Sequence, residues 1–132
     1  PCTVDGLGLL DVSTTMRAAK RVTQTTAKHL ATGTNVQGYE IHIGQTQGPD
    51  TLRPFAQLNG RNEGAISADG LVMGSYLHGM FSSDGFRHAF LKGLHIQSSA
   101  QAYSQTVDQT LNALADHLEK HLDISALLAS AR

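Results

Sequence analysis

The chain has 132 residues, with 10 Lys and Arg against 11 Asp and Glu, and therefore a formal net charge of -1. This length suits one domain with one core, and the balanced charge gives no electrostatic reason to expect a nucleic acid or an anionic membrane as partner. No apolar run approaches the roughly 20 residues of a membrane-spanning helix, and the single cysteine, Cys2, cannot form an internal disulfide, so we expect a cytoplasmic protein.

The first two thirds of the sequence predict short β-strands. Residues 7–12 form a short apolar run, and residues 21–26 are rich in β-branched side chains. After a turn signal, residues 36–43 alternate between apolar and polar side chains. This alternation predicts a strand with one apolar face, whereas its other face carries Glu40 and His42.

Three further segments follow in this part of the sequence. Residues 44–54 contain Gly, Pro, Asp and Gln and are predicted to form a loop. The apolar stretches 65–67 and 71–73 flank an Ala-Asp-Gly turn, which predicts a β-hairpin. Residues 74–80 then place His78 at the end of an apolar run, directly before a glycine.

The last third changes to helical periodicity. Ser83 or Asp84 can cap a first helix, and a second helix is expected to start near Ser99. Asp123 can cap a final short helix. The second helix has an apolar stripe over about five turns. Its apolar positions are Tyr103, Val107, Leu111, Leu114, Leu118 and Leu122. Strands followed by helices predict a mixed α/β domain whose sheet is not purely parallel.

Two short segments, residues 38–44 and 74–80, each place a histidine on a predicted strand that is followed by glycine. Imidazole exchanges its proton near neutral pH, so His42 or His78 could serve as a general base. The alternative for His78 is a core histidine that donates to a backbone carbonyl, or one that is simply exposed at the end of a strand. Glu40 shares a strand face with His42, so both side chains could reach one cleft.

The remaining candidates give weaker signals. The spacing of His42 and His78 matches no metal-binding motif, and zinc would require at least one more ligand, so we expect no metal site. His117 and His121 lie on the second predicted helix and are assigned to a solvated face. Cys2 is expected to be a terminal thiol without a role.

Several segments occur together, in order, between about residue 6 and residue 95. They are GLGLLDV (6–12), TTM (14–16), GYEIHIG (38–44), DG (69–70), GSYLHGMF (74–81), FR (86–87) and FL (90–91). This succession is similar to the C-terminal glutamine amidotransferase domain of cobyric acid synthases, within the class I, triad-type superfamily. The resemblance implies a partial flavodoxin-like α/β domain, in which a mixed sheet is followed by C-terminal helices. It also implies that residues 1–132 are the C-terminal portion of such a domain.

The resemblance implies a reaction as well. A cysteine thiolate attacks the side-chain amide of glutamine, a histidine moves the proton, and the resulting thioester is hydrolysed to glutamate. The released ammonia amidates ATP-activated carboxylates of a corrinoid during cobalamin biosynthesis. The family's catalytic histidine matches His78, and its cleft-lining strand matches Tyr39, Glu40 and His42, which are predicted to bind substrate. ATP and Mg²⁺ are expected only in a synthetase domain, so no cofactor is expected in this chain.

The sequence departs from the family pattern in two respects. The family's nucleophile lies on a glycine-rich strand-to-helix turn upstream of the GLGLLDV stretch, and Cys2 matches no such motif. We therefore expect the isolated chain not to hydrolyse glutamine. Met80 stands where many related amidotransferases carry a carboxylate, which agrees with the Cys-His pair of the cobyric acid subgroup. Ser75 stands where threonine is usual, and it keeps the hydroxyl group.

Two alternatives to this interpretation stay open. One is a related amidotransferase that acts on another acceptor, such as cobyrinic acid diamide or a cell-wall intermediate. Gly79 after His78, and the later Phe86-Arg87, favour the cobyric acid type. The other alternative is a non-catalytic interaction module. Because half of a doubly wound sheet exposes strand edges and apolar faces, we also expect self-association or strand exchange between copies.

Overall fold

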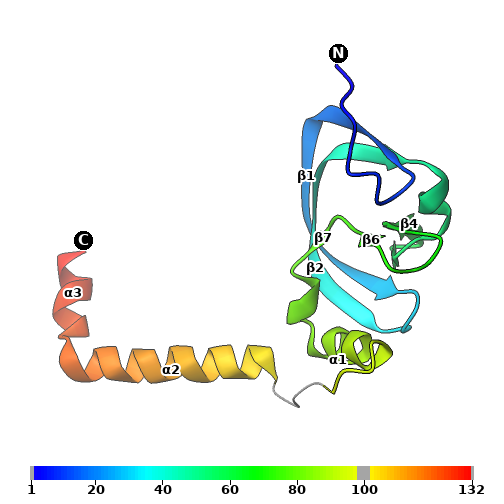
Figure 1. The fold of residues 1–132 in the computed structure, drawn as a ribbon. Helices are drawn as coiled ribbons and strands as arrows, with labels where there is room; N and C mark the ends of the chain where they lie inside the picture. Colours follow the sequence, from blue (N-terminus) through cyan, green and yellow to red (C-terminus); the bar gives the residue numbers. More distant parts are fainter. Residues whose placement is uncertain (1, 98–101, 132) are drawn as a thin grey trace. The chain divides into compact units, whose positions relative to one another are not determined.

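The computed structural model describes residues 2–97 and 102–131 (Figure 1). The chain divides into two compact units, residues 1–98 and residues 99–132. The described strands and the first α-helix lie in the first unit, and two further α-helices lie in the second. The predicted mixed α/β class, with strands first and helices after them, is confirmed.

A long antiparallel hairpin forms the framework of the first unit. Figure 1 shows its two strands, β1 and β2, side by side along most of their length. Among the described residues, one sheet holds five strands in the order β4-β3-β1-β2-β7, and each neighbouring pair is antiparallel. These strands are β1 (Ser13–His29), β2 (Asn35–Gln47), β3 (Ala56–Leu58), β4 (Arg61–Glu63) and β7 (Leu77–His78).

Local turn chemistry explains the smaller hairpins. Asn59 and Gly60 connect β3 to β4 with φ values of 48° and 79°, which suits a tight hairpin turn. The predicted hairpin around the Ala-Asp-Gly turn is confirmed, because β5 (Ala65–Ile66) pairs antiparallel with β6 (Met73–Gly74). Two short 3-10 helices lie in connections: η1 (Pro49–Leu52) between β2 and β3, and η2 (Met80–Ser82) between β7 and α1.

The core lies where the hairpin meets α1 (Asp84–Gly93). Ser83 occupies the N-cap position of this helix, as predicted. Phe86 from α1 is fully buried in the core. The buried cluster consists of Ala27, Val36, Phe55, Ala56, Leu58, Leu77 and Phe86. Burial of these apolar side chains joins the end of the hairpin, β3, β7 and α1 into one packed body.

The second unit contains α2 (Tyr103–His121) and α3 (Ile124–Ser130). The Asp123 carboxylate accepts a hydrogen bond from the Ala126 backbone N–H at 2.9 Å, so the predicted cap of the last helix is confirmed. The expected helix start near Ser99 lies outside the described residues. None of the described helices is both long and apolar enough to cross a membrane.

Two local predictions are corrected by the structure. Residues 7–12 do not form a strand, because residues 8–11 bend, and Leu7 is 89% exposed instead of packing in a core. The predicted loop at residues 44–54 begins only after Gln47, because residues 13–16 of β1 supply the pairing partner for the end of β2. Both errors concern pairing between distant segments, which local composition does not specify.

Candidate functional site

The short strand β7 places His78 beside β2. Residue pairing sets Tyr39 opposite His78 and Glu40 opposite Leu77. Opposed residues of an antiparallel pair point to the same face of the sheet, and successive residues point to opposite faces. His78 and Tyr39 therefore share one face, whereas Glu40 and Leu77 share the other. The sheet separates the predicted site residues into two groups.

The face that carries His78 is exposed and largely apolar. His78 is exposed, and Tyr39 retains 49% of its accessible surface. Ile43 follows on this face of β2, and Val22 of β1 lies opposite Ile41. The imidazole of His78 is thus accessible and has apolar neighbours on its own face.

The opposite face holds a charge cluster around Glu40, which is only 2% exposed, whereas its partners Arg21 and Arg61 remain about half exposed. The Arg61 guanidinium donates to Oε1 of Glu40 at 2.6 Å, and Arg21 Nε lies 3.0 Å from Oε2. Nε2 of His42 lies 3.3 Å from Oε1. A buried carboxylate is tolerated when such partners compensate for its lost hydration. The cluster links β1, β2 and β4 through one side chain.

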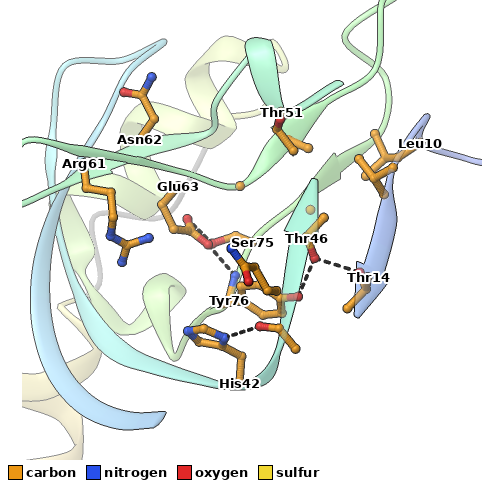
Figure 2. Close-up of a pocket in the computed structure, with 16 residues that line it drawn as sticks. Leu10, Thr14, His42, Thr46, Thr51, Arg61, Asn62, Glu63, Ser75 and Tyr76 are labelled. Atoms are coloured by element: carbon orange, nitrogen blue, oxygen red, sulfur yellow. Dashed lines mark hydrogen bonds between the residues drawn. The ribbon is translucent and has the colours of Figure 1, made fainter. Parts of the chain in front are cut away.

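His42 lies next to this cluster and lines a pocket of about 610 Å³ (Figure 2). The Nδ1–H group of His42 donates to the Gly44 carbonyl at 2.6 Å. The imidazole ring stacks on Tyr76, with ring centroids 4.4 Å apart and an interplanar angle of 16°. These contacts fix the ring in the pocket wall, on the sheet face opposite to His78.

Sequence reasoning missed several residues of this pocket. Glu63 is buried and accepts hydrogen bonds from the Ser75 hydroxyl at 2.9 Å and from the Tyr76 backbone N–H at 2.6 Å. Hydroxyl groups of Thr14, Thr46 and Tyr76 form a chain with separations of 2.7 and 2.5 Å (Figure 2). The available signal in the sequence was the Arg-Asn-Glu run at residues 61–63 after an Asn-Gly turn. Only Glu63 of this run is buried, and its burial depends on partners at residues 75 and 76 that the run does not indicate.

Further candidates from the sequence were Cys2, His117 and His121. Cys2 is a free, exposed cysteine. The rings of His117 and His121 lie 4.5 Å apart on α2, in the second unit, and both side chains are exposed. Within residues 2–97 and 102–131, no group of three or more His, Cys, Asp or Glu side chains is placed to hold a metal ion.

Comparison with known proteins decides the family. Residues 1–86 match the CobB/CobQ-like glutamine amidotransferase domain. The chain belongs to this family. It is 58% identical over 132 residues to the cobyric acid synthase of Cereibacter sphaeroides, covering 100% of this chain and 27% of that protein. It is 59% identical over 127 residues to that of Bradyrhizobium diazoefficiens, covering 96% of this chain and 26% of that protein.

A relative with lower sequence identity matches over nearly the same length of the chain. The chain is 47% identical over 128 residues to the cobyric acid synthase of Brucella canis, covering 97% of this chain and 26% of that protein. The chain thus spans about 27% of the length of the curated relatives that it matches. No solved structure gives a significant match. The resemblance found in the sequence is confirmed, and the chain is a CobB/CobQ-like glutamine amidotransferase domain segment.

Proposed function

We propose that this chain supplies the histidine-bearing portion of the glutamine amidotransferase domain in a cobyric acid synthase. The observation that carries the proposal is His78, held on β7 at an exposed sheet face within the family match. The cobyric acid synthases among the relatives favour a corrinoid as the acceptor over other acceptors. The domain's nucleophile would come from polypeptide outside these 132 residues.

In the proposed reaction, His78 accepts the proton of a cysteine thiol as the sulfur attacks the side-chain carbonyl carbon of glutamine. Collapse of the tetrahedral intermediate breaks the C–N bond, and the imidazolium returns the proton to the departing nitrogen, which leaves as ammonia. Water then hydrolyses the thioester to glutamate and restores the thiol. The ammonia would amidate corrinoid carboxylates activated by ATP with Mg²⁺ in a synthetase domain.

The exposed face suits His78 for this role. Gly79, directly after it, has a φ of 74°, which favours glycine, and a Cβ there would meet no atom within 4 Å. Substrate can therefore approach beside the imidazole without meeting a side chain at position 79. Tyr39, which shares the face, is proposed to contact the bound glutamine.

Glu40 and His42 are proposed to support the site from the other face of β2. Both carboxylate oxygens of Glu40 interact with Arg21, Arg61 and His42. These interactions connect neighbouring strands, and the oxygens are therefore not assigned to a substrate. His42 could still meet a ligand through the pocket that it lines. We therefore assign direct contact with glutamine to Tyr39 and a supporting role to the other two predicted residues.

The test is the substitution His78→Ala in the full-length synthase. Loss of a general base should lower glutamine-driven amidation roughly 10²- to 10⁴-fold. Amidation driven by added ammonia should persist, because it bypasses glutamine hydrolysis. His117→Ala, an exposed histidine on α2, is the matched control and should leave both rates unchanged. Unchanged glutamine-driven amidation in the His78 variant would refute the role of His78.

A further inference from the structure

His78 lies on a short strand that pairs with the edge of β2. The strand that carries it, β7, has only two residues, Leu77 and His78. Before them, the Ile41 N–H donates to the Tyr76 carbonyl at 3.0 Å. After them, η2 leads to α1. Besides the burial of Leu77 in the core, the contacts on either side of this short strand therefore determine where the imidazole lies.

Gly38 makes the close approach of β7 to β2 possible. It is buried on β2, next to Tyr39, the pairing partner of His78. A Cβ atom at position 38 would penetrate the backbone carbonyl oxygen of His78 and would lie 3.3 Å from Cδ1 and Cγ of Leu77. Because the blocking atom belongs to the backbone, a side chain at this position must displace β7 itself. The requirement for glycine is one of space between strands.

Ser83 holds the same segment at its other end. Serine at an N-cap usually accepts a hydrogen bond from its own helix, but the Ser83 side chain makes no such bond to α1. Instead, the Gln37 backbone N–H donates to Ser83 Oγ at 2.9 Å, and the Ser83 hydroxyl lies 3.3 Å from the Gln37 carbonyl that it can donate to. The hydroxyl thus takes the place of a strand partner for β2.

These two contacts fall on adjacent residues of β2. The Gln37 backbone forms hydrogen bonds with the Ser83 hydroxyl, and the absence of a side chain at Gly38 leaves room for the backbone carbonyl of His78. The segment from Leu77 to Ser83 is therefore attached to β2 at both ends, with His78 beside one attachment. We call Gly38 and Ser83 the β2-edge clamp.

We propose that the β2-edge clamp positions the imidazole of His78, so that Gly38 and Ser83 are positioning residues for glutamine hydrolysis. This inference rests on the proposed function. Gly38→Ala pushes the His78 backbone outward, and Ser83→Ala releases the far end of the segment. Misplacement of a catalytic group by about 1 Å can cost roughly 10²-fold in rate. We expect a loss of that size for Gly38→Ala and a smaller one for Ser83→Ala.

The kinetic test compares glutamine-driven with ammonia-driven amidation in the full-length synthase. Both clamp variants should lower kcat for the glutamine-driven reaction, leave KM for glutamine nearly unchanged, and retain the ammonia-driven rate. Ser83→Thr keeps the hydroxyl and should restore kcat. Gly85→Ala, whose Cβ meets no atom within 4 Å, and Ser130→Ala, which loses only a bond to the Leu127 carbonyl, are the matched controls.

A spectroscopic measurement separates this inference from the proposed function. The imidazole proton signals of His78, assigned by their loss in His78→Ala, should shift in Gly38→Ala and Ser83→Ala and stay in place in Gly85→Ala. If His78→Ala leaves glutamine-driven amidation intact, the proposed function fails whatever the spectra show. If His78→Ala abolishes that activity while both clamp variants keep wild-type kcat and ring signals, the clamp is refuted and the function stands. If Gly38→Ala does not fold, Ser83→Ala and its threonine rescue decide the matter.

Discussion

The two faces of β2 use the same seven-residue segment, residues 38–44, in different ways. On one face, Glu40 and His42 have their polar atoms engaged by side chains and backbone of the same unit. On the other face, Tyr39 and its neighbour His78 are exposed. The polar residues are the ones that face inward, which reverses the usual arrangement. A face whose interactions are complete stabilises the fold, whereas a face with accessible groups is available for chemistry.

The sharpest separation of the two faces is expected on β7 itself. Leu77 is 2% exposed and joins the core, so Leu77→Ala should lower the free energy of unfolding by about 2–5 kcal/mol. His78→Ala, one residue later and exposed, should lower it by about 0.5 kcal/mol or less. Urea unfolding of both variants checks this. Similar losses for the two neighbours would contradict the assignment of their side chains to opposite faces.

An intermediate effect is expected within β2. Glu40→Gln removes the charge that Arg21 and Arg61 share and should lower the free energy of unfolding by about 1–3 kcal/mol. Tyr39→Thr, which retains strand propensity on the exposed face, should change it by about 0.5 kcal/mol or less. Thermal unfolding of the pair compares the two faces directly. A Tyr39 variant less stable than the Glu40 variant would reverse the comparison.

Some of this arrangement was predictable from the sequence. The alternation in β2 indicated that Glu40 and His42 share a face, and the Asp123 cap was identified from local chemistry. Which face of the sheet carries the His78 side chain was not predictable, because it follows from the register of β7 against β2. The burial of Glu63 depends in the same way on partners at residues 75 and 76. Local patterns indicate an element, whereas strand register and buried polar contacts require the assembled sheet.

The smallest expected effect is on the pH dependence of stability, and it concerns the buried residue His29. His29 is 2% exposed, with ring centroids 4.6 Å from Phe55 and 5.1 Å from Phe86, and burial lowers its pKa below the ordinary value. The unfolded chain therefore binds this proton more readily than the folded chain. The stability that neutral His29 contributes is present above the unfolded pKa of about 6.5 and is lost as pH falls below it.

His29→Phe tests this contribution because phenylalanine fits an aromatic environment and does not titrate. Its free energy of unfolding should decline less steeply than that of the wild type between about pH 7 and pH 5. The exposed residue His117 provides the control, since His117→Phe should follow the wild-type pH dependence. Parallel curves for the His29 variant and the wild type would show that the buried imidazole does not make stability pH-dependent.

We propose that His78 of this chain is the proton-transferring histidine of a site whose thiol lies elsewhere. Covalent labelling with a glutamine-analogue electrophile, read by intact mass and peptide mapping, tests it most directly. We predict no labelling of this chain alone. When the nucleophile-bearing portion of the domain is supplied, the label should appear on a cysteine of that portion and should be lost with His78→Ala. Labelling of this chain alone at Cys2, lost with His78→Ala, would contradict the account.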